Sequence, residues 1–214
     1  MKTKIIPAIL VRNFEEFQAK VRLTENDFEI LQIDAIDGQF VANTTYYDIK
    51  AIQDLETKAS YELHLMVNDP LSVIKQVYSP KISRIIFHIE LVKNRVEEII
   101  AEIKNKNIKA GLALNPETPV SEIAPYINNL DIVLLMTVHP GWAGQGFMEE
   151  SYDKIRELRK MSEQIEIEVD GGVKDHNLKK IIDAGVNSPA MGSALLNTSD
   201  YAQTVKKLKA IING

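Results

Sequence analysis

Short apolar runs of strand type recur along the chain at intervals of roughly 20–30 residues, and charged amphipathic stretches separate them. We predict strands near residues 4–9, 29–34, 61–66, 84–89, 108–114, 131–137, 165–170 and 187–191. We predict helices near residues 13–25, 45–57, 70–78, 93–106, 119–128, 149–162, 175–184 and 199–212. Eight successive βα units can close on themselves, so we expect a single-domain (β/α)8 TIM barrel over residues 1–214. A doubly wound open sheet would also accept such units, but no G-x-G-x-x-G turn follows the first strand to favour it.

The last predicted strand conflicts with a regular ladder. Pro189 lies inside the segment 187–191 and has no backbone N–H to donate to a neighbouring strand. We therefore expect either that this strand begins at Pro189 or that the barrel is irregular there.

The composition excludes several classes of protein. The net charge of −5 gives no basic surface for nucleic acid or for an anionic membrane. The absence of cysteine excludes disulfides, cysteine-ligated zinc and thiol nucleophiles. The apolar run near the N-terminus is too short for a signal peptide, and no run approaches membrane-spanning length. We therefore expect a cytoplasmic protein that binds neither nucleic acid nor membrane.

Several predicted strands end on residues that can carry proton or metal chemistry. Asp34 and Asp170 each end one such strand, His64 ends the short run Tyr61–Glu62–Leu63–His64 within another, and Gln32 precedes Asp34 by two residues and so shares its face. Parallel strands bring their carboxyl ends to one face of a barrel. Two carboxylates, an imidazole and an amide oxygen could surround one divalent ion, or the two acids could transfer protons on opposite faces of a flat intermediate. Each residue alone is more often structural, and only their coincidence on one face favours a site.

Glycine-rich segments follow each of the last three predicted strands. They are His139–Pro140–Gly141–Trp142–Ala143–Gly144–Gln145–Gly146, Asp170–Gly171–Gly172 and Gly192–Ser193. Loops at these places often bind phosphate through backbone N–H groups, so no basic groove is required. Any one of these segments alone would be an ordinary tight turn, whereas the three together favour a phosphate site.

Other candidates leave two interpretations open. His88 and Glu90 could line the pocket or pack below it. Met66 and Met136 could form an apolar wall over a substrate, although ordinary core packing explains them equally well. Trp142, the one tryptophan of the sequence, lies in a glycine loop and could belong to a mobile lid.

At these residues the chain resembles the ribulose-phosphate 3-epimerase family, and the likeness runs almost from end to end. The matching segments are Pro7–Ala8–Ile9–Leu10, Asp34–Ala35–Ile36–Asp37–Gly38–Gln39–Phe40–Val41, His64–Leu65–Met66–Val67, Gly111–Leu112–Ala113–Leu114–Asn115–Pro116–Glu117–Thr118–Pro119, Leu134–Leu135–Met136–Thr137–Val138, Glu168–Val169–Asp170–Gly171–Gly172 and Gly192–Ser193–Ala194. In this order and at this spacing, the set is highly specific.

The resemblance implies an isomerase that interconverts D-ribulose 5-phosphate and D-xylulose 5-phosphate by proton abstraction at C3 through a metal-stabilised enediolate. It implies that Asp34 and Asp170 are the catalytic acids and also metal ligands, with His64 as a third ligand and Gln32 as a candidate fourth. The residues expected to bind the substrate and its phosphate are His64, Met66, Gly141, Trp142, Ala143, Gly144, Gly171, Gly172, Gly192 and Ser193. We expect a phosphorylated ketose substrate, a divalent metal, no organic cofactor and a homo-oligomer.

Some residues depart from the family's pattern. Gln32 stands where the family usually has a histidine ligand, and an amide oxygen suits harder cations better than zinc, so zinc, manganese, iron, magnesium and cobalt all stay open. Ala8 replaces a serine of the first strand. These departures leave two alternatives: an epimerase for a hexulose 6-phosphate such as D-allulose 6-phosphate, or a catalytically impaired paralogue that only binds sugar phosphates.

Overall fold

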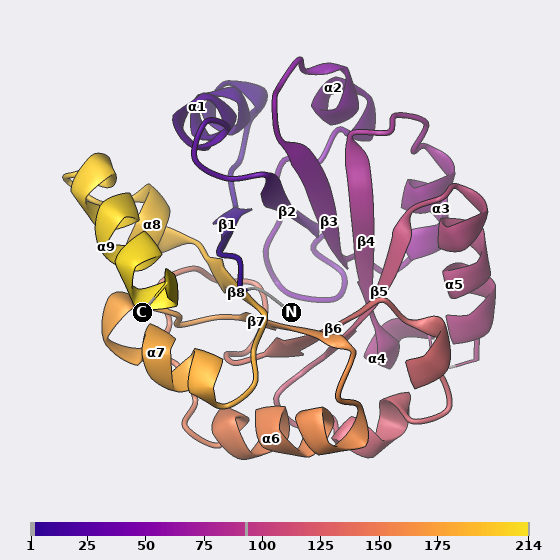
Figure 1. Cartoon of the computed structure of the whole chain (residues 1–214). Coiled ribbons are helices and arrows are strands. Elements are labelled where there is room, and N and C mark those ends of the chain that lie inside the picture. Colours follow the sequence, from indigo (N-terminus) through magenta and orange to yellow (C-terminus); the bar gives the residue numbers. More distant parts are fainter. Residues whose placement is uncertain (1–2, 93, 214) are drawn as a thin grey trace.

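Eight parallel strands pair in the order of the sequence, and the last strand closes on the first (Figure 1). This computed structural model describes residues 3–92 and 94–213. The strands are β1 (Ile6–Ile9), β2 (Ile30–Ile36), β3 (Ser60–Met66), β4 (Ile82–His88), β5 (Lys109–Leu114), β6 (Ile132–Met136), β7 (Glu166–Asp170) and β8 (Ser188–Met191). The closed barrel confirms the predicted (β/α)8 fold.

Helices follow the strands and cover the outside of the barrel (Figure 1). The longer ones are α1 (Phe14–Thr24), α2 (Ile49–Asp54), α3 (Pro70–Lys75), α5 (Val96–Asn105), α6 (Ser151–Met161), α7 (Asp175–Asp183) and α9 (Tyr201–Asn213). Three begin at side-chain caps, because Asn13, Asp48 and Asp69 each accept a hydrogen bond from the backbone N–H three residues further on. In the described part of the chain, no helix has the length and apolar character needed to cross a bilayer.

Three details differ from the sequence-based predictions. The predicted helix 119–128 is wrong: the chain forms two 3-10 turns, Val120–Ile123 and Ile127–Asn129, because Pro125 between them has no N–H and interrupts a helix. The four-residue helices α4 (Ile89–Val92) and α8 (Ser193–Leu196) were not predicted. Pro189 does not begin its strand: it lies second in β8, beside Val169, and the barrel still closes.

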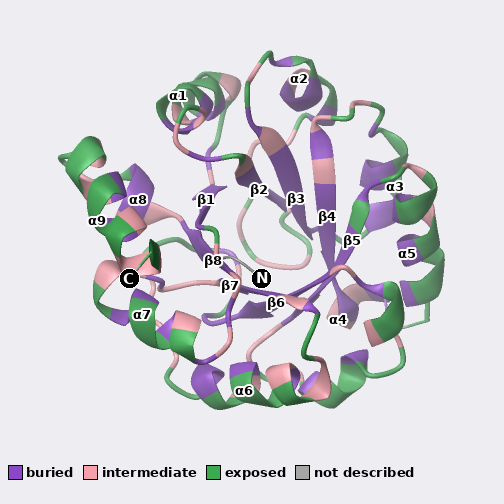
Figure 2. Ribbon diagram, viewed as in Figure 1, coloured by how far each residue is buried: buried purple, intermediate pink, exposed green. Residues whose placement is uncertain are grey.

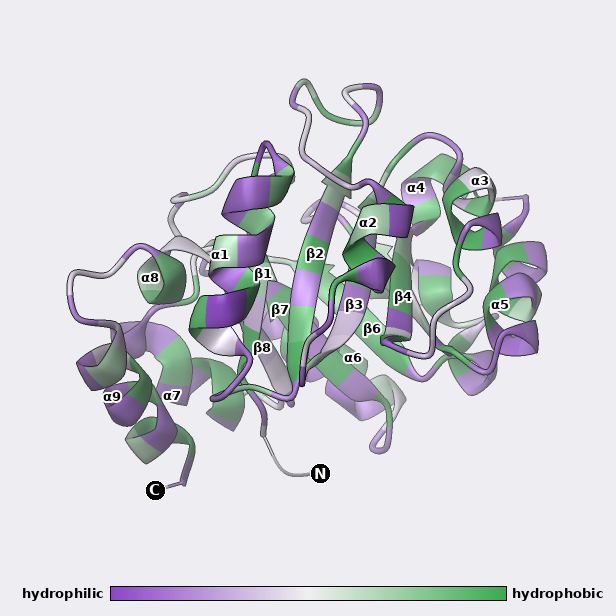
Figure 3. Cartoon of the chain, turned by 90° about the horizontal axis from the view of Figure 1, so that it is seen from above, coloured by the Kyte–Doolittle hydropathy of each residue, from purple (hydrophilic) through white to green (hydrophobic). Residues whose placement is uncertain are grey.

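The strands are buried on both faces, whereas the helices are buried on one side only. Figure 2 shows the strands as almost wholly buried and each outer helix with an exposed side. In Figure 3 the helices carry alternating hydrophobic and hydrophilic bands. The main apolar core therefore lies between the sheet and the helices, and two smaller apolar clusters lie among the inward-facing residues.

Part of the barrel interior is charged. The guanidinium of Arg84 on β4 lies 2.8 Å from Glu166, 3.3 Å from Glu62 and 3.8 Å from Glu168. Burial and the neighbouring Glu62 carboxylate raise the pKa of Glu168 well above its usual value, and burial also raises that of Glu62. Arg84 is thus the cation that compensates this cluster of buried acids.

Arg84→Leu should destabilise the protein by about 3–5 kcal/mol, because it leaves buried carboxylates without their cation. Urea denaturation measures the change. The matched control is Arg156→Leu, which breaks the exposed pair of Arg156 with Asp153 and should cost less than about 1 kcal/mol. Equal effects of the two substitutions would contradict a compensating role for Arg84.

Candidate active site

The register of the strands brings the predicted chemical residues to one end of the barrel. Asp34 on β2 lies beside His64 on β3, and Asp170 ends β7 beside Met136 of β6. Ligand atoms of Asp34, His64 and Asp170 all lie within 4.8 Å of one another. The structure therefore places these three side chains together, although β7 is far from β2 and β3 in the sequence.

The Gln32 side chain lies at the centre of this group. Its amide Nε2 donates hydrogen bonds to Asp34 Oδ1 at 2.7 Å and to Asp170 Oδ2 at 2.6 Å, and it lies 3.3 Å from His64 Nδ1. Its Oε1 is buried and has no hydrogen-bond partner. Two carboxylates offer only acceptors, so the amide must turn its nitrogen toward them and leave its oxygen unpaired.

The electrostatics of the group follow from burial and close like charges. Burial and the neighbouring Asp170 carboxylate raise the pKa of Asp34. Burial disfavours a charged His64, but its hydrogen bonds and charge interactions with Asp170 and Asp34 prevail and raise its pKa to about 9. A positive charge is therefore strongly favoured among these groups, whether it is a proton or a cation.

A second histidine lies behind the first. His64 Nε2 is 3.0 Å from His88 Nε2, and His88 Nδ1 is 3.2 Å from Glu90 Oε2. Burial lowers the pKa of His88 to about 4. Burial disfavours ionised Glu90, yet hydrogen bonds from His88, Thr118 and the Asn115 backbone lower its pKa to about 2. Of the two interpretations of His88 and Glu90, the structure supports packing behind the site, because neither is among the residues that line the pocket.

Asp34, His64 and Asp170 fit a divalent cation by their chemistry and mutual distance. Two carboxylate oxygens and one imidazole nitrogen are donors suited to zinc, manganese or iron. The unpaired Gln32 Oε1 is a further buried acceptor next to them, but it would face a cation only after a reversal of the amide.

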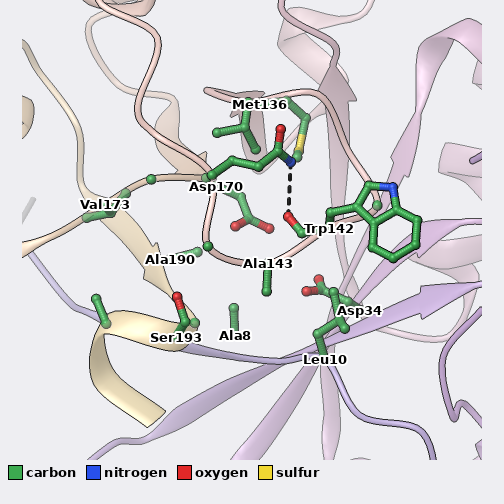
Figure 4. Close-up of a pocket in the computed structure, with 18 of the residues that line it drawn as sticks. Ala8, Leu10, Asp34, Met136, Trp142, Ala143, Asp170, Val173, Ala190 and Ser193 are labelled. Carbon is green, nitrogen blue, oxygen red and sulfur yellow. Dashed lines mark hydrogen bonds between the residues drawn. The ribbon is translucent and has the colours of Figure 1, made fainter. Parts of the chain in front are cut away.

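A pocket opens above these residues, and Figure 4 shows the carboxylates of Asp34 and Asp170 directed toward its middle. The predicted binding residues in its wall are Met66, Gly141, Trp142, Ala143, Gly144, Gly171, Gly172, Gly192 and Ser193. His64 is wholly buried and lies behind this wall. Trp142 is 56% exposed, and its carbonyl accepts a hydrogen bond from Gln145 at 3.0 Å (Figure 4).

Several residues of this wall were not predicted as binding residues, although Gln145 stands in a predicted phosphate loop and Leu10, Val138 and Ala194 stand in segments that resemble the family. The others are Val173, Lys174 and Ala190. Most of these side chains carry no group that does proton, metal or phosphate chemistry. Only their positions next to predicted residues at the strand ends could have indicated that they line the pocket. Lys174, two residues after the Gly171–Gly172 turn, is the basic side chain of this wall.

Two glycines after β7 are required by their surroundings. Gly171 has φ +119°, and an added Cβ would lie 2.4 Å from Val138 Cγ2. Gly172 has φ +66°, and an added Cβ would lie 2.2 Å from the backbone nitrogen of Phe147. Only glycine therefore allows this backbone to approach the β6–α6 loop so closely.

A closed parallel barrel with two acids and a histidine at the carboxyl ends of its strands is typical of an enzyme, and comparisons with known proteins show its family. The profile of the "Ribulose-phosphate 3 epimerase family" matches residues 4–196. The "Ribulose-phosphate 3-epimerase, cytoplasmic isoform" of Oryza sativa subsp. japonica is 35% identical, over 99% of this chain and 95% of its own. The "Ribulose-phosphate 3-epimerase" of Schizosaccharomyces pombe is 36% identical, over 98% of this chain and 93% of its own. The chain belongs to the ribulose-phosphate 3-epimerase family and is an isomerase, an epimerase that acts on carbohydrate phosphates.

Solved structures with the same fold are more distant in sequence. A 3-keto-L-gulonate-6-phosphate decarboxylase from Vibrio cholerae superposes with a TM-score of 0.78 at 14% identity, covering 100% of this chain and 98% of the other. A 3-hexulose-6-phosphate synthase from Salmonella typhimurium gives 0.76 at 15% identity, with 99% of each chain covered. At this identity the likeness concerns the fold alone.

Gln32→Leu should lower the stability of the metal-free protein by about 1–3 kcal/mol, because Asp34 and Asp170 lose the donor that they share. Urea denaturation in the presence of a chelator measures this loss. Gln18→Leu on the exposed side of α1 is the matched control and should change stability by less than about 0.5 kcal/mol. An unchanged Gln32→Leu protein would mean that the amide does not hold the two carboxylates together.

Proposed function

We propose that this epimerase interconverts D-ribulose 5-phosphate and D-xylulose 5-phosphate by moving the proton of C3 between substrate and Asp34 and Asp170. One observation carries the proposal: two carboxylates from different strands converge on one pocket, within 4.8 Å of each other (Figure 4). Proton removal from one face and return to the other inverts a single carbon without moving the sugar.

The two acids are suited to opposite roles. The raised pKa of Asp34 means that its carboxyl group holds a proton at a higher pH than a free aspartate does. One acid accepts the C3 proton while the other delivers a proton from the opposite side, and the roles exchange in the reverse direction. His64 beside them compensates part of their negative charge.

A divalent metal would be held by Asp34, His64 and Asp170, with Gln32 Oε1 as a fourth donor once the amide is reversed. Bound there, the cation would lower the energy of the negative charge that develops on the substrate oxygens, a contribution of several kcal/mol, roughly. The donor set suits zinc, manganese, iron, magnesium or cobalt.

The phosphate of the substrate would bind at the glycine loops after β6, β7 and β8. Gly171, Gly172, Gly192 and Ser193 line this side of the pocket, and backbone N–H groups bind phosphate well where no side chain intervenes. Lys174 in the same wall adds a positive charge.

Two observations favour alternative functions. Ala8 and Ala190 are small side chains in the pocket wall, which leaves room for a longer sugar such as a hexulose 6-phosphate. The Gln32 amide holds both acids by hydrogen bonds, which would favour a binding protein of low activity if no cation displaces it.

We further propose a single-domain protein of the cytoplasm that forms a homo-oligomer. The name of the rice relative, a cytoplasmic isoform, supports the location. Light scattering on the protein as it elutes from a size-exclusion column measures its molar mass, and a mass of one chain would contradict the homo-oligomer.

The reaction is tested by deuterium exchange. Incubation of metal-reconstituted protein with ribulose 5-phosphate in D2O should place deuterium at C3, detected by NMR. Asp34→Asn and Asp170→Asn should lower kcat by about 10²–10⁴-fold, whereas the exposed Asp183→Asn should not. Comparing kcat/KM for ribulose 5-phosphate and allulose 6-phosphate decides between the two sugars. If no deuterium enters C3 whichever divalent metal is supplied, the epimerase mechanism is wrong.

The role of Gln32 is tested by restoring an imidazole. Gln32→His should raise the affinity for zinc about tenfold or more, because imidazole binds zinc better than a neutral amide and does not tie up both carboxylates. Calorimetric titration with zinc gives the affinity. If zinc binds Gln32→His and the unaltered protein equally well, Gln32 does not face the cation.

A further inference from the structure

We propose that His88 and Glu90 are positioning residues that determine which ring nitrogen of His64 carries the hydrogen, and so leave the nitrogen that faces the two aspartates free to bind a cation. The inference rests on the proposed function, because its consequence is the readiness of His64 to bind a cation. Hydrogen-bonding groups follow one another from Asn115, in the loop after β5, through Glu90 and His88 to His64.

The direction of this chain of hydrogen bonds is set at Glu90. Its Oε1 accepts a hydrogen bond from the backbone N–H of Asn115 at 2.7 Å and one from the Thr118 hydroxyl. Its Oε2 lies 3.2 Å from His88 Nδ1. A carboxylate that receives such donors has no hydrogen to give, so His88 Nδ1 must carry the hydrogen of this bond.

His88 passes this direction on to His64. The His88 ring is wholly buried, and the Phe40 ring packs against it with the ring centroids 4.8 Å apart, so its orientation is held. A neutral imidazole with its hydrogen on Nδ1 presents Nε2 as an acceptor. His64 Nε2, at 3.0 Å, must then be the donor of the bond between the two rings.

The hydrogen of a neutral His64 is thereby placed on the side away from the pocket. Its Nδ1 faces Asp34 Oδ1 at 3.1 Å and Asp170 Oδ2 at 3.5 Å, and it keeps a lone pair for a cation. The opposite tautomer would direct an N–H at the place where the cation binds. Outer hydrogen-bond partners of this kind typically change metal affinity by about 10–100-fold.

Glu90→Gln tests the direction of the chain without changing its shape. The donors of Asn115 and Thr118 hold the amide oxygen on their side, so the amide nitrogen faces His88 Nδ1 and requires an acceptor there. The hydrogen of His88 should move to Nε2, where it opposes the N–H of His64. We expect the affinity for Mn²⁺, measured by calorimetry, to fall about 10–100-fold.

Nitrogen-15 NMR of the metal-free protein reads the position of the hydrogen directly. The chain has four histidines, and the exposed rings of His139 and His176 serve as references. The wild-type His88 should carry its hydrogen on Nδ1, and the Glu90→Gln variant should carry it on Nε2. A role of Glu90 in packing alone would not move this hydrogen.

Two substitutions of His88 provide the rescue test. His88→Gln can accept from His64 with its oxygen and donate to Glu90 with its nitrogen, so it should retain Mn²⁺ affinity within about tenfold of the wild type. His88→Leu can do neither and should bind Mn²⁺ as weakly as Glu90→Gln. Glu117→Gln, which alters the exposed partner of His139, is the matched control and should leave Mn²⁺ binding unchanged.

A wild-type His88 with its hydrogen on Nε2 would overturn the proposal. So would a Glu90→Gln variant with an unmoved hydrogen and full Mn²⁺ affinity. If the wild-type protein binds no Mn²⁺, the metal part of the proposed function fails. The nitrogen spectra still decide the positioning role in that case, because they are recorded without metal.

Discussion

The closure of eight parallel strands in one register is the constraint on which the rest of the structure depends. Parallel pairing points every strand the same way, so all carboxyl ends lie on one rim. The β2–β3 register sets Asp34 beside His64, and the β6–β7 register sets Asp170 at the same level as Met136. A shift by one residue in either pair would turn these side chains out of the barrel and into the apolar layer beneath the helices.

The same alternation places polar groups inside the barrel in successive levels. Glu168 precedes Asp170 by two residues and Glu62 precedes His64 by two, so both glutamates lie one level below the site. Arg84 compensates that lower level, whereas the upper level holds two aspartates with one imidazole as their nearest basic partner. This imbalance of charge favours a positive charge at the upper level.

The candidate site depends on hydrogen-bond direction as much as on proximity. The carboxylates of Asp34 and Asp170 are acceptors, so Gln32 must present its amide nitrogen to them. The Glu90 carboxylate is an acceptor for His88 Nδ1, so His88 presents its other nitrogen, Nε2, as an acceptor to His64. Each of these assignments follows from counting donors and acceptors around a buried group, because an unmet group in the interior costs about 1–3 kcal/mol.

The sequence alone predicted much of the fold and that Asp34, His64 and Asp170 lie together at one end of the barrel. Apolar runs ending on Asp34, His64 and Asp170 predicted that these residues lie at or near the carboxyl ends of strands: β7 ends at Asp170, whereas β2 and β3 continue two residues further, to Ile36 and Met66. Pro125 carried a signal against the predicted helix 119–128 that outweighs its periodicity. His88 and Glu90 could not be assigned, since nothing local tells whether a strand-end side chain lines a pocket or packs behind one.

What the sequence determined by itself is the alternation of strand and helix, the identity of the chemical groups and the glycine turns that follow the last strands. Only the tertiary structure decided how those groups interact. It showed that the Gln32 amide lies between two carboxylates and that His88 stands between His64 and Glu90. The physical reason is that hydrogen-bond partners and charge neighbours are set by the closure of the barrel, which joins residues far apart in the chain.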